Sequence, residues 1–425
     1  MQTPGAPSHK PRRTLPLYAA FDCTGCGQCC KDWRITVDKA AFKRAQHHLQ
    51  HSPHPGRISA QNAFTLLEDR NERSWATIKH TDDGSCVFLD EDNLCYWHRH
   101  FGAQTKGWLC RAYPNISHHS PTSQTIGAAL SCKPLVELMR TRFAKPMTLV
   151  DAPTDFAKQA AEHPEWVMNP GAKMWLLGDK LVDGEAYDQI EAALLDFVAI
   201  EGVPLGLRLL MGRLFLEKLL QRTKHQNPLK AKTVERLFAN IERDATALLV
   251  QAAELSAAHP TLIARSVRGF FARMAQVGIP RARAARFNAI IDHLHLNAPM
   301  ELIAARLWSL HQQRFVPQMP QLEGMLGAYA SHRIVRAQAV SLGGLIPGMT
   351  EVMLALTLVW ATALAQAEEA NSPVTPEILG DAIATAEKIF FHAAAFEAFF
   401  DVNADFSAIH GVAYAGVLAE IFNGR

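Results

Sequence analysis

Cysteine is the residue type whose number and spacing in this sequence could do chemistry. All eight cysteines of the 425-residue chain lie within its first 132 residues. They are Cys23, Cys26, Cys29, Cys30, Cys86, Cys95, Cys110 and Cys132. The first four form the run FDCTGCGQCC, and a spacing of two residues lets the thiolates of one short loop share a metal ion or one corner of an iron–sulfur cluster. The sequence therefore predicts that these eight thiols bind metal.

The adjacent pair Cys29 and Cys30 constrains how many metal sites the chain can build. Side chains of neighbouring residues diverge, by about 100° on a helix and to opposite faces on a strand. The two thiols are therefore not expected to bind one ion together. The eight cysteines then predict either two four-thiolate sites or one four-thiolate cluster with several auxiliary thiols. Zinc and iron–sulfur clusters both accept four thiolates, and the spacing does not choose between them.

The charge of the chain is nearly balanced, which excludes several classes of protein. With 43 Lys and Arg against 41 Asp and Glu, the chain is neither a histone-like polycation nor a disordered acidic protein. Basic residues are frequent between residues 201 and 290, but they are spread through amphipathic helical patterns with few interleaved aromatic residues. Such residues are typical of solvated helix faces, so no nucleic acid is expected as a partner.

The beginning of the chain and its longest apolar run bear on its compartment. The first residues lack the apolar core of a secretory signal, so a cytoplasmic protein is expected, in which clustered cysteines bind metal rather than form disulfides. The longest apolar run covers residues 352–365 and is shorter than the roughly 18 to 20 residues that cross a bilayer. It predicts a buried helix, and no membrane insertion is expected.

Beyond the cysteines, the apolar residues recur at the 3.6-residue spacing of helices, for example over residues 207–222. The expected fold is mostly α, with a small cysteine-rich metal-binding N-terminal module followed by a multi-helix C-terminal domain. No alternating run indicates a large sheet. The expected divisions are a flexible basic arm over residues 1–20, the cysteine-cluster metal-binding module over 21–140, a linker over 141–175 and the helical domain over 176–425. Thr350 and Thr375 are predicted to cap two of the helices.

Five segments around the cysteines carry a family resemblance. They are the C-x2-C-x2-C-C run, KDWRITVD, CVFLDEDNLCYWHRHFG, WLCRAYP and ALSCKP, between residues 21 and 135. Together they resemble the cysteine-cluster family described as zinc- or iron-chelating, and within it the FliB-type flagellin lysine N-methylases. The later segment AEKIFFHAAAFEAFF, which contains His392, is similar to the family's late helix with a single histidine.

The resemblance implies an enzyme and its cofactors. The implied reaction transfers a methyl group from S-adenosylmethionine to the ε-amine of protein lysines, with flagellin or a similar surface-filament protein as the partner. The implied metal cofactor is an iron–sulfur cluster of the 4Fe-4S type, with zinc as the alternative. The usual G-x-G donor loop after a strand is missing. The alternative function is that of a non-catalytic zinc- or iron-chelating interaction module, and a third is electron transfer.

Four residues close to the cysteines are candidates for contacts with the metal site or substrate. Trp33 is expected to shield the site from solvent. His98 is expected to lie beside the site or at the surface, because enough thiols are present to supply the ligands. Tyr113 could stack on the methyl donor or pack against the cysteine loops, and Arg111 lies close to it in the sequence. No catalytic residue is identified.

Overall fold

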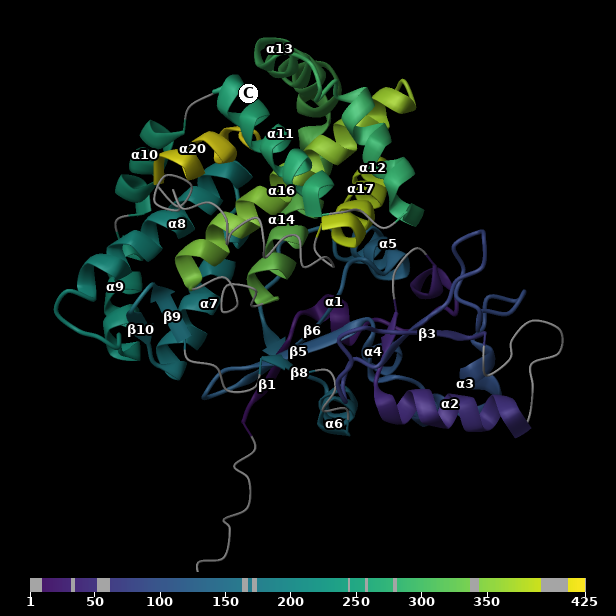
Figure 1. Ribbon diagram of the computed structural model, residues 1–425. Helices are drawn as coiled ribbons and strands as arrows, with labels where there is room; N and C mark the ends of the chain where they lie inside the picture. The colour runs from purple at the N-terminus through teal and green to yellow at the C-terminus, as the bar shows by residue number, and fades with distance from the viewer. Residues whose placement is uncertain are drawn as a thin grey trace, which may run out of the picture.

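The structure is a computed structural model of the chain. It describes residues 10–31, 35–51, 62–162, 167–169, 174–243, 245–256, 259–277, 281–336, 344–390 and 412–424. A large helical part, which contains the C-terminus, sits against a smaller part of short helices and strands (Figure 1). The expected mostly α fold, with the cysteine-rich segment preceding the helices, is confirmed.

The small part is built from short elements around a small core. Its elements are η1 (Gln28–Cys30), β2 (Thr36–Val37), α2 (Lys39–His51), β3 (Phe64–Leu66), β4 (Ala76–Ile78), α3 (Tyr96–Phe101), η2 (Ala103–Thr105) and α4 (Trp108–Ala112). The strands form an antiparallel sheet in the order β2-β4-β3. Phe64, Phe88 and Trp97 pack together in its core. A core of this size buries little apolar area, so the small part needs another source of stability.

A five-stranded sheet joins the small part to the helices. Its strands and the helices between them are β1 (Arg12–Thr14), α1 (Pro16–Ala19), β5 (Asn115–His119), β6 (Gln124–Ala128), α5 (Lys133–Arg142), β7 (Val150–Asp151), α6 (Thr154–Glu162) and β8 (Val167–Asn169). The strand order is β7-β1-β6-β5-β8, with β1 parallel to β6 and β5 antiparallel to β6. The sequence indicated no such sheet, because its strands are short and come from distant segments.

Two segments that were expected to be an arm and a linker contribute strands to this sheet. Of the arm expected over residues 1–20, the structure describes residues 10–20, and Leu15 and Leu17 there are fully buried. The arm's basic residue Arg13 pairs with Asp188 at 3.0 Å and with Glu191 at 3.1 Å. These contacts fix residues that looked flexible in sequence, since the charges have acidic partners on a distant helix. The linker expected over residues 141–175 likewise supplies β7 and β8 to the sheet.

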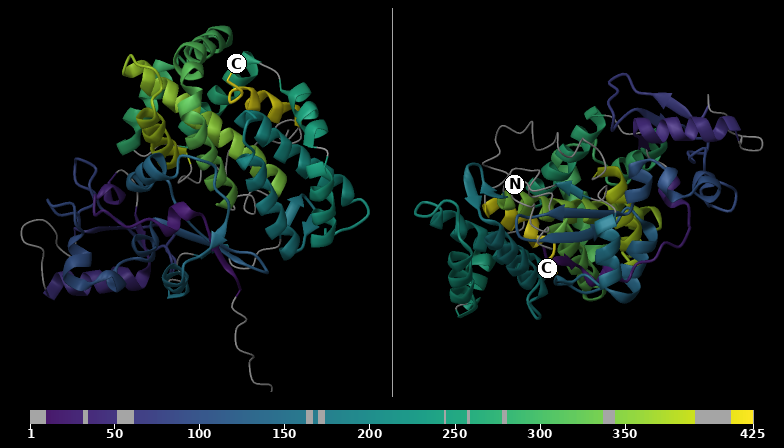
Figure 2. Two further views of the ribbon diagram at one scale, coloured as in Figure 1. Left: turned by 180° about the vertical axis from the view of Figure 1, so that it is seen from behind. Right: turned by 90° about the horizontal axis from the view of Figure 1, so that it is seen from below.

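The helical part begins after a short hairpin. Its elements are β9 (Met174–Leu177), β10 (Lys180–Val182), α7 (Gly184–Ala199), α8 (Leu205–Arg222), α9 (Ala231–Arg243), α10 (Ala245–Leu255), α11 (Pro260–Val277), α12 (Arg281–His293), α13 (Met300–Leu310), η4 (His311–Phe315), η5 (Val316–Gln318), α14 (Met319–Val335), α16 (Leu345–Glu369), α17 (Pro376–Phe390) and α20 (Val412–Glu420). The Asp183 carboxylate accepts a hydrogen bond from the Ala186 N–H at 2.8 Å and caps α7. Figure 2 shows these helices from behind and from below.

The two predicted helix caps have different outcomes. Thr375 accepts a hydrogen bond from the Ile378 N–H at 3.3 Å and caps α17, as predicted. Thr350 does not cap a helix, because α16 begins at Leu345 and Thr350 donates to the Ile346 carbonyl within it. Pro347 is tolerated there because the first N–H groups of a helix have no partner inside it.

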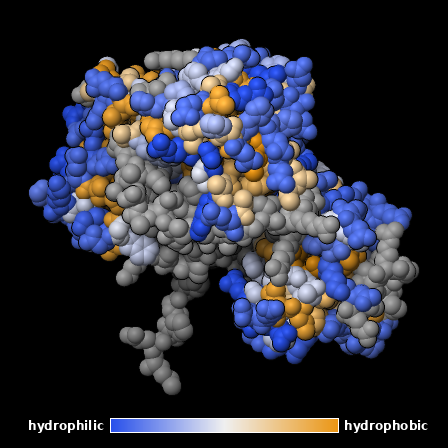
Figure 3. Space-filling model, turned by 45° about the horizontal axis from the view of Figure 1, so that its top comes forward, coloured by the Kyte–Doolittle hydropathy of each residue, from blue (hydrophilic) through white to orange (hydrophobic). Residues whose placement is uncertain are grey.

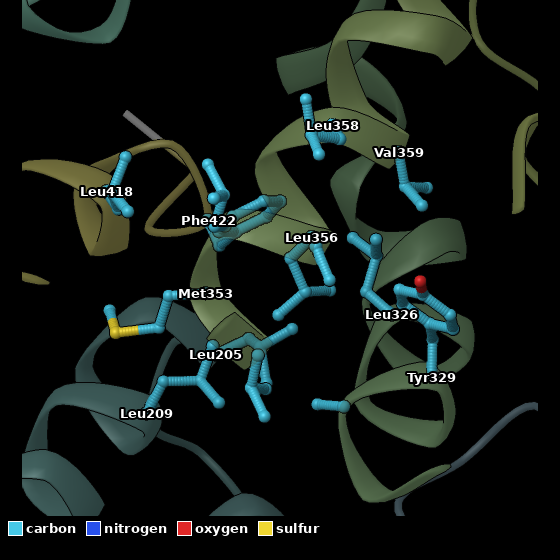
Figure 4. Close-up of a cluster of buried hydrophobic side chains, with 14 of the residues drawn as sticks. Leu205, Leu209, Leu326, Tyr329, Met353, Leu356, Leu358, Val359, Leu418 and Phe422 are labelled. Carbon is cyan, nitrogen blue, oxygen red and sulfur yellow. The ribbon is translucent and has the colours of Figure 1, made fainter. Parts of the chain in front are cut away.

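Helix α16 is the centre of the large core. Met353, Leu356 and Leu358 on α16 lie among side chains from α8, α14 and the C-terminal segment (Figure 4). This helix is long and apolar enough to cross a membrane by length and composition, and its apolar window is entirely buried in the protein, as the sequence predicted for residues 352–365. The surface seen in Figure 3 is mostly hydrophilic, with apolar side chains in small patches.

The large core also encloses an ionic network. The Glu387 carboxylate accepts hydrogen bonds from Tyr329 at 2.8 Å, Arg333 at 2.9 Å and Arg336 at 2.6 Å. Arg333 also pairs with Glu351. Burial of charges is compensated here by close pairing, and the two arginines lower the pKa of Glu387 to about 2 against the effect of burial.

His332 connects this network to the N-terminal segment. The Tyr18 hydroxyl lies 2.5 Å from His332 Nδ1, and His332 Nε2 lies 3.8 Å from Glu387 Oε1. Burial lowers the pKa of His332 to about 3 and raises the pKa of Tyr18. The imidazole is therefore neutral and the Tyr18 O–H donates to it.

His332→Gln is expected to make stability less dependent on pH. The unfolded histidine, with a pKa of 6.5, takes up a proton that the folded one, with a pKa of about 3, does not. The native protein therefore loses stability as the pH falls below about 6.5, by about 1.4 kcal/mol per pH unit for this one group. Urea unfolding followed by circular dichroism between pH 6.5 and 4.5 measures the slope. The exposed His225→Gln is the control, and an equal slope in both variants would contradict the assignment.

Candidate metal centre

The cysteine loop is shaped by two glycines. Gly25 and Gly27 have φ angles of +64° and +69°, a conformation that other residues rarely adopt. A Cβ on Gly27 would come within 3.0 Å of Asn93, so the loop packs closely on the turn before Cys95. The Cys30 N–H then donates to the Gly27 carbonyl at 2.9 Å and closes η1.

Five of the predicted cysteines line one cavity of about 40 Å³ in the small part. The Cys86 N–H donates to the Cys30 carbonyl at 2.7 Å, which holds the two segments together. The lining residues are Cys29, Cys30, Cys86, Cys95, Cys110, Lys106, Tyr113, Ile35, Ile78, Phe88 and Trp97. The cavity therefore combines thiols from four distant segments with one amine, one phenol and an apolar shield.

The thiols of Cys29 and Cys30 do not diverge as expected. Their Sγ atoms lie 3.9 Å apart, and both residues line the cavity. The tight turn η1, entered through the left-handed Gly27, brings the two side chains together. Neither the helix nor the strand geometry assumed from the sequence applies to this turn.

The other three cysteines, Cys23, Cys26 and Cys132, do not line this cavity. Cys23 is exposed, and Cys132 immediately precedes α5. Cys26 lines a groove of about 460 Å³ between the loop, α5 and α17, together with Lys133 and Asp381. In Figure 1, α5 lies directly below α17, and the Lys388 ammonium approaches the Gln28 carbonyl at 3.5 Å.

Burial favours the protonated form of three of the eight thiols. Burial raises the pKa of Cys110 to about 12 and the pKa of Cys132 to about 12, and burial also raises the pKa of Cys86. The hydrogen bond from Cys30 lowers the pKa of Cys29 to about 6. All eight cysteines are described, and none forms a disulfide. Because neighbouring thiolates repel one another, a bound cation is needed before these thiols can ionise together.

Lys106 is the cavity residue that sequence reasoning missed. Burial opposes the charge of its ammonium, but the nearby thiols of Cys95 and Cys110 raise its pKa above the usual value. A positive charge inside a thiolate site balances the negative charge of the ligands. No motif marks Lys106 in the sequence. Its position four residues before Cys110 is the only local signal.

The four other predicted neighbours have different positions. Trp33 lies outside the described residues. His98 is exposed and does not line the cavity, and Arg111 donates to the Gln104 carbonyl at 3.4 Å. Tyr113 does line the cavity, its hydroxyl lies 3.2 Å from Ser131 Oγ, and burial raises its pKa well above the usual value. Of these candidates, the structure brings only Tyr113 to the thiols among the residues it describes. The other candidate of the sequence, His392, also lies outside the described part of the chain.

The donor set fits a thiolate-bound centre. Within the described parts of the chain, no three His, Cys, Asp or Glu side chains are close enough together to hold a single ion. The thiols instead surround a cavity of about 40 Å³, which is larger than the 10 to 15 Å³ that about one water occupies. Soft thiolates, a buried ammonium and an apolar shield are the surroundings that suit an iron–sulfur cluster or zinc.

Lys106→Met is expected to weaken metal binding roughly tenfold, the lower range for residues that support metal ligands. Methionine keeps the length of the side chain but removes the charge that balances the thiolates. The affinity is measured anaerobically, by competition with a chelator. Lys79→Met, at an exposed position after β4, is the matched control. Equal affinities of the two variants would show that Lys106 does not act on the site.

Comparison with known proteins identifies the family. The profile of the CxxCxxCC family, described as "Putative zinc- or iron-chelating domain", matches residues 22–132. The flagellar biosynthetic protein FliU of Salmonella muenchen is 32% identical over 124 residues, which cover 28% of this chain and 71% of FliU.

Two further relatives carry the name Lysine-N-methylase. They come from Salmonella typhimurium and Salmonella choleraesuis, and each is 32% identical over 124 residues. The match covers 28% of this chain but only 30% of each methylase. No solved structure matches the chain significantly. The shared segment and the thiols gathered in it show that the chain belongs to the FliB-type family of CxxCxxCC proteins.

Proposed function

We propose that this protein is a cytoplasmic, iron–sulfur-containing protein lysine N-methyltransferase that uses S-adenosylmethionine. Its proposed substrates are lysines of flagellin or of a similar surface-filament protein. The observation that carries the proposal is the 124-residue match to two proteins named Lysine-N-methylase. The eight cysteines all fall in the segment matched by the family profile, which supports the metal cofactor. The cysteines are the proposed ligands of that cofactor.

The chemistry sets requirements for the site. A lysine ammonium with a pKa of about 10.4 must lose its proton before the amine can attack. Its lone pair then forms the new N–C bond while the C–S bond of the sulfonium breaks, and a neutral thioether leaves. An iron–sulfur cluster with one iron free of cysteine ligands would hold the amino and carboxylate groups of the donor, whereas a cluster with four cysteine ligands would only shape the domain.

The groove beside Cys26 provides side chains suited to a lysine substrate. Asp381 and Glu377 lie in it, where they pair with Lys133 and Arg140, each at 2.6 Å. Carboxylates at the groove attract an approaching ammonium. An aromatic ring attracts the sulfonium of the donor, and Tyr113, which lines the cavity behind the loop, is the proposed partner.

The proposal is tested with protein that has been loaded anaerobically with iron and sulfide. The protein is incubated with methyl-labelled S-adenosylmethionine and flagellin from the same cell, and label on lysine is expected. Flagellin with acetylated lysines is the control, because acetylation removes the attacking amine. Loaded protein that transfers no label to flagellin would favour the alternative, a metal-chelating interaction module without catalysis.

A further inference from the structure

The eight thiols divide between two different surroundings. Cys86 is only 4% exposed, and Cys30, Cys95 and Cys110 pack against the same small core. Cys132 packs against the large core of the helical part instead. Cys23 is exposed and Cys26 lies at the groove. Cys30, Cys86, Cys95 and Cys110 are called the inner set. Cys23, Cys26, Cys29 and Cys132 are called the outer set.

Three thiols of the outer set lie in the cysteine loop, and the fourth, Cys132, lies at the start of α5. Cys26 and Lys133, the residue after Cys132, line the same groove. The hydrogen-bond distance of 3.2 Å between Tyr113 and Ser131 places the start of α5 next to the cavity wall. Cys23, Cys26 and Cys29 follow one another at two-residue intervals in one loop.

Cys29 and Cys30 form the boundary between the two sets. Their thiols are 3.9 Å apart, and both residues line the cavity of the inner set. Of the two, Cys30 packs against the small core and Cys29 does not. One dipeptide can therefore supply one thiol to each side of the loop.

We infer that the eight cysteines build two metal centres: a closed inner centre held by Cys30, Cys86, Cys95 and Cys110, and an outer centre held by Cys23, Cys26, Cys29 and Cys132 at the groove between the loop, α5 and α17. Both take thiophilic metal, as iron–sulfur cluster or zinc. The inner centre is enclosed by apolar side chains and stabilises the small part. The outer centre faces the groove and is the one that a bound molecule can reach. The inference does not depend on methyl transfer.

Paired substitutions in the full chain test the division. The double variant Cys26→Ser/Cys132→Ser is expected to lose the metal and any sulfide of the outer centre. It is expected to keep the metal and any sulfide of the inner centre. The protein is purified anaerobically, and both metals and sulfide are quantified. Thr24→Ala, in the same exposed loop, is the matched control and is expected to keep both complements. Loss of all metal, or of none, from the paired variant would overturn the inference, since either result means a single centre.

A second measurement does not rely on variants. Metal-loaded wild-type protein is treated with increasing chelator, and iodoacetamide labelling of each cysteine is read by mass spectrometry. Cys23, Cys26 and Cys132 are expected to become reactive at lower chelator concentration than Cys86, Cys95 and Cys110. Simultaneous exposure of all these thiols in one step would overturn the two-centre division.

Discussion

Cys86→Ser is expected to remove metal from the cavity and to unfold the small part between residues 35 and 110, while the large helical core stays folded. Cys86 is buried in the small core, and its backbone pairs with Cys30. Structural zinc contributes about 10 to 16 kcal/mol of apparent binding free energy in small metal-dependent domains. That exceeds the net stability of most domains, so a core as small as this one should not survive the loss.

Hydrogen exchange read by mass spectrometry measures this effect segment by segment. Amides of β4 and α3 should lose protection in Cys86→Ser and in chelated wild-type protein, whereas amides of α8 and α16 should keep it. Ser85→Ala, at the neighbouring residue, changes only a hydrogen bond to Asp83 in an exposed turn and is the control. Unchanged metal content and protection in Cys86→Ser would refute the assignment of this thiol as a ligand.

Glu387→Gln is expected to destabilise the large core by about 3 to 5 kcal/mol, the range for breaking a buried ion pair. The carboxylate accepts bonds from Tyr329, Arg333 and Arg336 in a fully buried site. A neutral amide leaves two guanidinium groups with Glu351 as the remaining carboxylate of the network. Since burial of an unpaired charge is costly, the substitution should raise the free energy of the folded state and so lower the free energy of unfolding.

Urea unfolding at neutral pH measures this difference. Glu377→Gln on the same helix is the control, because Glu377 is 64% exposed and pairs with Arg140 at the surface, where a pair contributes about 0 to 1 kcal/mol. The pKa of Glu387 is about 2 in the folded protein against 4.5 unfolded. Its contribution is therefore present above pH 4.5 and is lost as the pH falls toward 2. A Glu387→Gln variant as stable as Glu377→Gln would show that the network contributes nothing.

The parts of the structure that follow local rules could be predicted from sequence. The helices were predicted because their apolar spacing is local, and the C-x2-C run because its ligands lie within one loop. The five-stranded sheet was missed since strands such as β1 and β6 contain only three to five residues, and Arg12 pairs with Gln124 across the whole small part. No short window of sequence contains that pairing.

The candidate site was also predictable only where its features depend on nearby residues in the sequence. Lys106 and the turn that brings Cys29 and Cys30 together depend on where distant segments pack, and neither has a pattern of its own. The ionic network is similar, because Tyr18, His332 and Glu387 lie far apart in the sequence and share no motif. Their role depends on a contact between Tyr18 and His332, which are 314 residues apart in the sequence.

Because β1 pairs with β6, the small part is inserted between two strands of one sheet and is not a separate domain at the end of a single linker. Residues 12–14 lie in the sheet before the cysteines, and residues 115–128 return to it after the first seven of them. Both ends of the cysteine segment are therefore anchored on the same rigid base. A change in that segment on gain or loss of metal therefore acts on two strands of the sheet at once.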